Sequence, residues 1–241
     1  MDVGHRLAKA AALMGDPSRA AMLWSLLGGE SRPASELAML ANISPQTASN
    51  HLRLLLDAGF LKATPAGRNK FYRLASPPVA AAIESLAGAV LPGHRPADGI
   101  ARHTAPDLIF ARTCYDHLAG ELSVALLRAL SARSYLRPHA RDFQLTPEGG
   151  RFLEKLGVDV PAARSSRRRF AYACLDWSHR VPHLGGALGA ALLDWMLRSR
   201  LVARRQHGRA VRLTDLGRDR FSRLFSIRIA RDGRSAQALD T

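Results

Sequence analysis

The chain has 241 residues and carries 35 lysines and arginines against 20 aspartates and glutamates, a net charge of +15. This length suffices for two domains, and the positive charge favours a polyanionic partner such as nucleic acid. No apolar run approaches the roughly 18–20 residues of a membrane span, and the N-terminus lacks the pattern of a secretion signal. Two cysteines cannot form a disulfide framework, so we expect a cytoplasmic protein with no membrane partner.

The N-terminal part of the chain has clear helix boundaries. Residues 2–14 show helical periodicity and stop at Gly15. Asp16 then serves as an N-cap with Pro17 at the first helical position, and two glycines at 28–29 end this second helix. We therefore predict two successive helices before residue 30.

Two further helices are predicted in the next thirty residues. A short one starts near Ser35, and a longer one runs from Pro45, with Ser44 as its N-cap, to a stop at Gly59. The apolar stripe of the longer helix consists of Leu52, Leu55 and Leu56.

A hairpin and a last helix complete this region. Apolar residues flank a Pro-Ala-Gly-Arg-Asn tip between residues 60 and 75, which predicts a β-hairpin, and a helix follows from about Pro78 to Ala89. The order of helices and hairpin is that of a winged helix-turn-helix. Such a domain places one helix in the DNA major groove and the hairpin, or wing, along the backbone.

The helix from Pro45 is the predicted recognition helix, because its early polar side chains suit base edges and phosphates. Cationic and amide groups in the wing suit the DNA backbone, and Tyr72 either adds a phosphate hydrogen bond or packs internally. The predicted DNA-binding residues are Ser44, Gln46, Thr47, Ser49, Asn50, His51, Arg53, Arg68, Asn69, Lys70 and Tyr72. A winged helix used only for protein contacts is the alternative.

These residues resemble the ArsR-type (ArsR/SmtB) bacterial repressors over roughly residues 5–90. The matching motifs are Asp-Pro-Ser-Arg at a helix start, Glu-Leu-Ala, Ser-x-x-Thr-Ala-Ser-x-His-Leu and Ala-Gly-Phe-Leu. The resemblance implies a homodimer, formed through the first and last helices of the domain, that binds a double-stranded DNA operator. It also implies release from the operator when an effector binds.

The chain departs from the metal-sensing members of that family at two places. The start of the Glu-Leu-Ala helix reads Glu36-Leu37-Ala38 with no thiol or imidazole, and the last helix of the domain offers Glu84 alone. The positions at which the family places its metal ligands are therefore empty. Sensing must lie elsewhere in the chain or use a small organic ligand.

Beyond a Pro- and Gly-rich linker at 92–103, the chain repeats itself weakly but in order. Phe-Ala-x-x-Cys-x-Asp occurs at 110–116 and 170–176, His-Leu-small-Gly at 117–120 and 183–186, and Leu-Thr-x-x-Gly at 145–149 and 213–217. This conserved order predicts a duplication. We expect repeats at about 104–158 and 164–228, each resembling a winged helix with its cysteine on a helix, and a tail at 229–241.

The predicted fold is thus mainly α with short β-hairpins: an N-terminal winged helix-turn-helix (1–91) and an α-rich C-terminal sensor or dimerisation domain (104–228) of two winged-helix-like repeats. If the repeats pack about a pseudo-twofold axis, equivalent residues meet near it. The candidate ligands for a divalent metal such as zinc are then Cys114, Asp116, His117, Cys174, Asp176, His179 and His183.

Other interpretations of this cluster remain open at the level of sequence. The same residues suit a thiol-reactive metalloid or reversible oxidation, and they also suit inherited core positions or an organic-ligand pocket. The spacing from Cys to His is three residues in one repeat and nine in the other, which argues against strict symmetry. No catalytic motif is present, so we expect a repressor and not an enzyme with a targeting domain. The same DNA-binding role with a small organic ligand, or with no effector, is the alternative.

Overall fold

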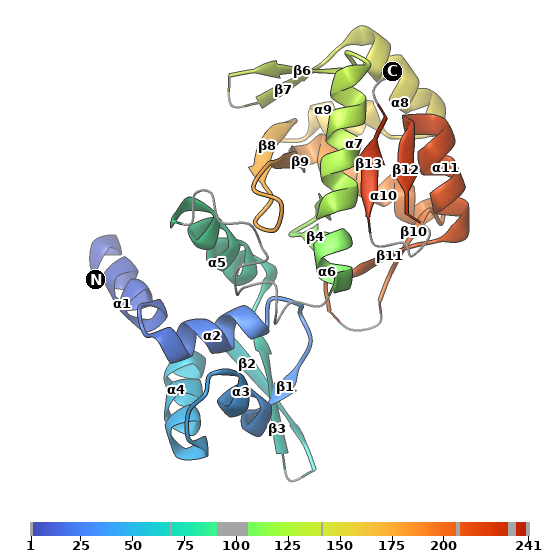
Figure 1. The fold of residues 1–241 in the computed structure, drawn as a ribbon. Coiled ribbons are helices and arrows are strands. Elements are labelled where there is room, and N and C mark those ends of the chain that lie inside the picture. The colour runs from blue at the N-terminus through green and yellow to red at the C-terminus, as the bar shows by residue number, and fades with distance from the viewer. Residues whose placement is uncertain are drawn as a thin grey trace. The chain divides into compact units, whose positions relative to one another are not determined.

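The computed structural model describes residues 2–67, 69–90, 106–140, 142–205, 208–230 and 235–239. The chain divides into two compact units, Met1–Leu86 and Ala87–Thr241, and mixes helices with several small sheets (Figure 1). The expected linker at 92–103 lies outside the described residues, as does Arg68. None of the helices in the described ranges is long and apolar enough to cross a membrane.

The elements up to residue 90 form the predicted winged helix-turn-helix. The strands make one antiparallel sheet in the order β1-β3-β2, and β2 and β3 are the wing. The helices are α1 (Val3–Met14), α2 (Pro17–Ser25), α3 (Ala34–Leu40), α4 (Pro45–Asp57) and α5 (Pro77–Val90), and the strands are β1 (Arg32–Pro33), β2 (Leu61–Ala66) and β3 (Asn69–Leu74).

Capping residues start α2 and α4 where the sequence predicts. The Asp16 carboxylate accepts a hydrogen bond from the backbone N–H of Arg19 at 2.9 Å, and the Ser44 hydroxyl accepts one from that of Thr47 at 3.1 Å. The α4 residues that face the core are Ala48, Leu52 and Leu55, whereas Leu56 is half-buried. The polar face of α4 is thereby left to solvent.

The C-terminal unit is built from short hairpins alternating with helices. Its first half contains α6 (Pro106–Phe110), β4 (Arg112–Cys114), β5 (His117–Ala119), α7 (Glu121–Ala132), β6 (Leu136–His139), β7 (Asp142–Leu145), α8 (Pro147–Leu156) and α9 (Val160–Ser165). Its second half contains β8 (Tyr172–Leu175), β9 (Pro182–Gly185), α10 (Gly186–Arg198), β10 (Val202–Arg204), β11 (Val211–Leu213), α11 (Asp215–Phe225), β12 (Ile227–Ile229) and β13 (Ala236–Ala238).

The two halves share the order hairpin, helix, hairpin, helix. In each, the last helix of the series has a threonine N-cap: Thr146 accepts from the N–H of Gly149, and Thr214 from that of Gly217. This confirms the predicted strand that feeds a threonine-capped helix. The winged-helix-like nature of each half stays a prediction.

The prediction that each cysteine lies on a helix is wrong. Cys114 ends strand β4 and Cys174 lies in strand β8, each in an antiparallel hairpin with the strand that follows. These strands are three or four residues long, too short to show a period of two. Of the two helices predicted around each cysteine, only the one that follows His-Leu-small-Gly is present, as α7 in the first half and α10 in the second.

A glycine stands between each of these hairpins and its helix. Gly120 and Gly186 both have φ of +89°, a backbone conformation that other residues adopt at a cost. A Cβ on Gly120 would lie 2.7 Å from the carbonyl oxygen of Phe110, and one on Gly186 would lie 2.7 Å from that of Phe170. Equivalent glycines therefore make the same close backbone approach in both halves.

The expected tail at 229–241 differs from what the structure shows. Strand β13 pairs antiparallel with β12, and both strands contact α7, which crosses the middle of the unit (Figure 1). The core beneath is a single cluster centred on α7 and α10, with an aromatic group of Trp195, Phe221 and Phe225.

Candidate functional site

The two hairpins that carry the cysteines place each one opposite a histidine. Cys114 pairs with His117 across β4 and β5, and Cys174 pairs with His183 across β8 and β9. Cross-strand neighbours have side chains close together on one face. The spacings of three and nine residues therefore give the same pairing, because the extra residues lie in the loop between β8 and β9. The unequal spacing is therefore compatible with a symmetric arrangement of the two Cys–His pairs.

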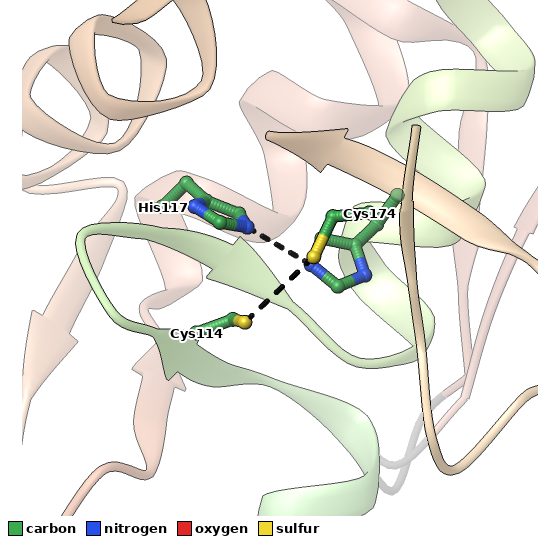
Figure 2. A group of neighbouring side chains, drawn as sticks. Cys114, His117 and Cys174 are labelled. Atoms are coloured by element: carbon green, nitrogen blue, oxygen red, sulfur yellow. Dashed lines mark hydrogen bonds between the residues drawn. The ribbon is translucent and has the colours of Figure 1, made fainter. Parts of the chain in front are cut away.

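The two Cys–His pairs meet in the structure (Figure 2). The Nε2 atoms of His117 and His183 lie 3.1 Å apart, and the Sγ atoms of Cys114 and Cys174 lie 3.9 Å apart. One donor atom from each of the four lies within 4.8 Å of the others. We call these four residues the Cys2His2 cluster. Both imidazoles are buried, and both thiols are partly buried.

These distances suit a tetrahedral zinc centre. With Zn–S bonds of about 2.3 Å and Zn–N bonds of about 2.0–2.1 Å, a tetrahedron separates two sulfurs by about 3.8 Å and two nitrogens by about 3.3–3.4 Å. The observed separations are 3.9 Å between the sulfurs and 3.1 Å between the nitrogens. Two thiolates and two imidazoles are a donor set typical of zinc and related soft or borderline metals.

A carboxylate faces the outer nitrogen of each histidine. Asp116 Oδ1 lies 3.3 Å from Nδ1 of His117, and Asp176 Oδ2 lies 3.3 Å from Nδ1 of His183. The two aspartates predicted as ligands therefore lie behind the histidines and outside the cluster. Each carboxylate in turn contacts an arginine, Arg168 for Asp116 and Arg112 for Asp176.

Asp176 accepts several hydrogen bonds. It is fully buried, and its oxygens accept from Arg112 at 3.0 Å, from the N–H of Gly120 at 2.7 Å and from the N–H and hydroxyl of Ser178 at 3.0 and 2.6 Å. Burial alone would raise the pKa of this carboxyl, but the charge of Arg112 and a hydrogen bond from His179 lower it far below its usual range.

The thiol of Cys114 is held in its protonated form. Its hydrogen-bonding contact with Cys174 and its burial raise the pKa to about 11, against a smaller opposite effect of His117. A protonated thiol is a poor nucleophile and reacts slowly with oxidants. A bound metal ion takes thiolates, so its binding displaces these protons.

His179 does not join the cluster. Its ring nitrogens lie 3.7 Å from Glu121 Oε2 and 3.5 Å from Asp176 Oδ1. Burial would lower its pKa, but hydrogen bonds with these two carboxylates raise the pKa to about 9. A charged His179 thus contacts two acidic groups behind the centre, so its position suits a structural role.

In the N-terminal unit, the structure exposes most of the predicted DNA-binding side chains of α4. His51 is the exception: its Nδ1 lies 3.2 Å from Arg19, and its Nε2 lies 3.9 Å from Asp16. Ser44 and Thr47 bond to each other through their hydroxyls at the helix start. The exposed members on this helix and the turn before it are Ser44, Gln46, Thr47, Ser49, Asn50 and Arg53.

The wing requires one correction. Tyr72 has 8% of its surface exposed and belongs to the core of the unit, so its packing role is the correct one of the two expected from the sequence. Side chains alternate along a strand, and Tyr72 shares its face with the buried Leu74. Asn69 and Lys70 are exposed near the tip.

Sequence reasoning missed two cations on the wing. Lys62 and Arg73 are exposed and lie directly opposite each other across β2 and β3. Like charges in this arrangement repel and destabilise a hairpin, so their pairing favours a polyanion on this face. The alternation of the strands, with Leu61 and Leu74 buried, would have identified them.

Comparisons with known proteins agree with this picture. A family described as a helix-turn-helix domain matches residues 14–63. An uncharacterised HTH-type transcriptional regulator of Bacillus subtilis, YdfF, is 42% identical over 223 residues, which are 92% of this chain and 98% of the relative. The chain belongs to the HTH-type transcriptional regulators. The N-terminal motifs of this regulator resemble those of the ArsR type, and the alignment with the relative is too long to be confined to either unit.

Two solved structures are similar to the regulator over about a third of its chain. The homodimeric winged helix-turn-helix domain of a possible ArsR-family regulator from Mycobacterium bovis is 24% identical, covers 34% of this chain and 75% of its own, and has a TM-score of 0.32. The cadmium sensor CmtR of Mycobacterium tuberculosis is 35% identical, covers 35% of this chain and 87% of its own, and has a TM-score of 0.31.

Proposed function

We propose that this regulator is a repressor that binds an operator duplex as a homodimer and is released when a divalent metal ion binds the Cys2His2 cluster. The observation that supports the release step is the convergence of the four donor atoms within 4.8 Å of one another. Zinc or a related thiophilic metal is the proposed effector, because two thiolates and two imidazoles suit that class of ion.

The DNA-binding step is supported by the exposed polar face of α4 and by the cations of the wing. Gln46 and Asn50 project from the start of the recognition helix, where amide side chains suit adenine edges. Lys62, Lys70 and Arg73 supply positive charge for the phosphate backbone. Two copies of this surface, related by a dimer axis, would read the two halves of a palindrome.

The metal step is supported by the matched construction of the two halves. We propose that they arose by duplication, because equivalent glycines share a φ of +89° and equivalent cysteines and histidines meet. A metal ion held by one Cys–His pair from each half would fix the two hairpins to each other. The ion would then bind more tightly to the conformation in which the two hairpins lie together than to any other. An effector requires such a difference in affinity between conformations.

The proposal is tested with the purified full chain and with DNA that it selects from a random duplex library. Fluorescence anisotropy of the selected DNA is followed as Zn²⁺ is added to metal-free protein. We expect operator affinity to fall by about 5–150-fold, the usual range of allosteric coupling. Cys114→Ser and Cys174→Ser should bind the DNA normally and ignore Zn²⁺, whereas His139→Gln, an exposed position outside the cluster, should respond like the wild type. Zn²⁺ binding without any change in DNA affinity would contradict the sensor role.

A further inference from the structure

We propose that Asp116 and Asp176 are positioning residues of the metal centre: each holds its histidine in the tautomer and orientation that turns Nε2 toward the ion. This inference rests on the proposed metal binding at the Cys2His2 cluster. The aspartate of the repeated Cys-x-Asp motif is not a metal ligand, and the proposal gives this aspartate a role.

The geometry of the imidazoles is the first support. Both Nδ1 atoms lie 3.3 Å from a carboxylate oxygen, and both Nε2 atoms point to the shared centre, 3.1 Å from each other. A neutral imidazole has one N–H, and an acceptor beside Nδ1 keeps the proton there. The Nε2 lone pairs of His117 and His183 would then face each other. A metal cation between them would bind both lone pairs, whereas without metal the 3.1 Å contact is a hydrogen bond that uses a proton on one Nε2.

The charges around the centre are the second support. Arg168 pairs with Asp116 and Arg112 pairs with Asp176, so neither carboxylate adds net charge to the surroundings. The charged His179 is likewise offset by Glu121, whose Oε2 lies 3.7 Å from its ring. The remaining charges are those of two thiolates, once deprotonated, and of the ion. A divalent cation makes this sum zero, which is what a largely buried centre requires. Monovalent ions would leave it negative.

The burial of His183 is the third support. The Nδ1 atom of His183 is buried and makes no hydrogen bond within the described residues, although Asp176 Oδ2 lies 3.3 Å away. A buried donor without a partner is costly. A small turn of the ring toward the carboxylate would satisfy it and would orient Nε2 at the same time. Metal-bound histidines are commonly held in this way by a carboxylate.

Asp176 also links the two halves of the unit. It belongs to the second half, yet it accepts hydrogen bonds from Arg112 and from the N–H of Gly120 in the first. Gly120 directly follows the hairpin of Cys114 and His117. Asp176, which faces His183, is thus held by the part of the chain that supplies Cys114 and His117. Asp116 makes the opposite connection through Arg168.

The experiment uses Co²⁺ as a spectroscopic probe of the metal-free full chain, with wild type, Asp116→Asn and Asp116→Glu compared. Thiolate-to-cobalt charge transfer and the intensity of the d–d bands report the ligands and their geometry, and competition with a chelator reports affinity. Asp142→Asn is the matched control, because Asp142 also pairs with an arginine at a partly exposed site but lies beside no histidine of the cluster. Loss of such an outer carboxylate typically weakens metal binding by about 10–100-fold.

We expect Asp116→Asn to bind Co²⁺ about 10–100-fold more weakly than wild type, with altered d–d bands, and Asp116→Glu to restore part of the affinity. Asp176→Asn should show a larger loss, but it removes the carboxylate that faces the buried Arg112 and endangers folding, so Asp116 carries the test. Equal affinities and spectra for Asp116→Asn and Asp142→Asn would overturn the inference while leaving the proposed metal centre intact. A wild type that shows no thiolate-to-cobalt band would overturn both.

Discussion

His117 and His183 lie 66 residues apart in the chain, yet their Nε2 atoms are 3.1 Å apart in the fold. Each is paired across a hairpin with a cysteine, and the two cysteines also meet. The contact depends on how the two hairpins are fixed to the helices that follow them. Mutations at those junctions should therefore affect the centre without touching its ligands.

Gly120→Ala should destabilise the C-terminal unit by about 2–4 kcal/mol, because the left-handed φ and the crowding of its Cβ against Phe110 add. Gly150→Ala is the control: this glycine lies inside α8, and the nearest atom to an added Cβ is 4.0 Å away. That change should stabilise by up to about 1 kcal/mol. Urea unfolding of the two variants measures their free energies of unfolding. Equal changes for Gly120→Ala and Gly150→Ala would contradict the close backbone approach at Gly120.

In the N-terminal unit, mutations of base-contacting and phosphate-contacting residues should affect DNA binding differently. Asn50→Ala should lower affinity for the selected operator by about 1–3 kcal/mol and relax its sequence preference, with little change in salt dependence. Lys62→Ala should weaken binding to all sequences alike and reduce the slope of log K against log salt by about 1. Anisotropy titrations at several salt concentrations distinguish these results. A Lys62→Ala variant with an unchanged salt slope would remove the wing face from the interface.

Tyr72→Phe should leave operator affinity unchanged, because this side chain is buried in the core of the unit. We therefore expect its hydroxyl to make no contact with a phosphate. The same anisotropy titration checks the expectation, with Lys70→Ala as the variant that should lose affinity from the exposed part of the same strand. A loss for Tyr72→Phe that matched the loss for Lys70→Ala would show the tyrosine at the DNA.

The His179 site predicts a pH dependence of stability. The carboxylates of Asp176 and Glu121 raise the folded-state pKa of His179 to about 9, above its unfolded value of roughly 6.5. Its stabilising contribution is therefore complete below about pH 6.5 and is lost as the pH rises through 9. In chelator, thermal unfolding of His179→Gln should fall less over this range than that of wild type, with His139→Gln as an exposed control. Parallel pH curves for wild type and His179→Gln would exclude this contribution.

The sequence predicted much of this fold, for reasons visible at particular residues. Asp16 with Pro17 and Ser44 with Pro45 start helices because the cap and the proline act locally. The matched surroundings of Cys114 and Cys174 indicated equivalent positions but left open whether the two residues meet, and in the structure their Sγ atoms lie 3.9 Å apart.

The errors come from features without a local signal. Strands of three or four residues have too little alternation to be told from a helix, so the cysteines were placed on helices. Alternation along its strand places Tyr72 on the face of Leu74, but only tertiary packing decides that this face is buried. The aspartates fall behind the histidines because strand pairing, unlike sequence spacing, decides which side chains converge.

We propose that four side chains from two hairpins bind one metal ion. This is measured by X-ray absorption at the zinc edge on full-length protein that has been loaded with Zn²⁺ and cleared of excess metal. We expect one zinc per chain with two sulfur ligands at about 2.3 Å and two nitrogen ligands at about 2.0–2.1 Å. Zinc bound through oxygen and nitrogen alone, or protein that retains no zinc, would contradict it.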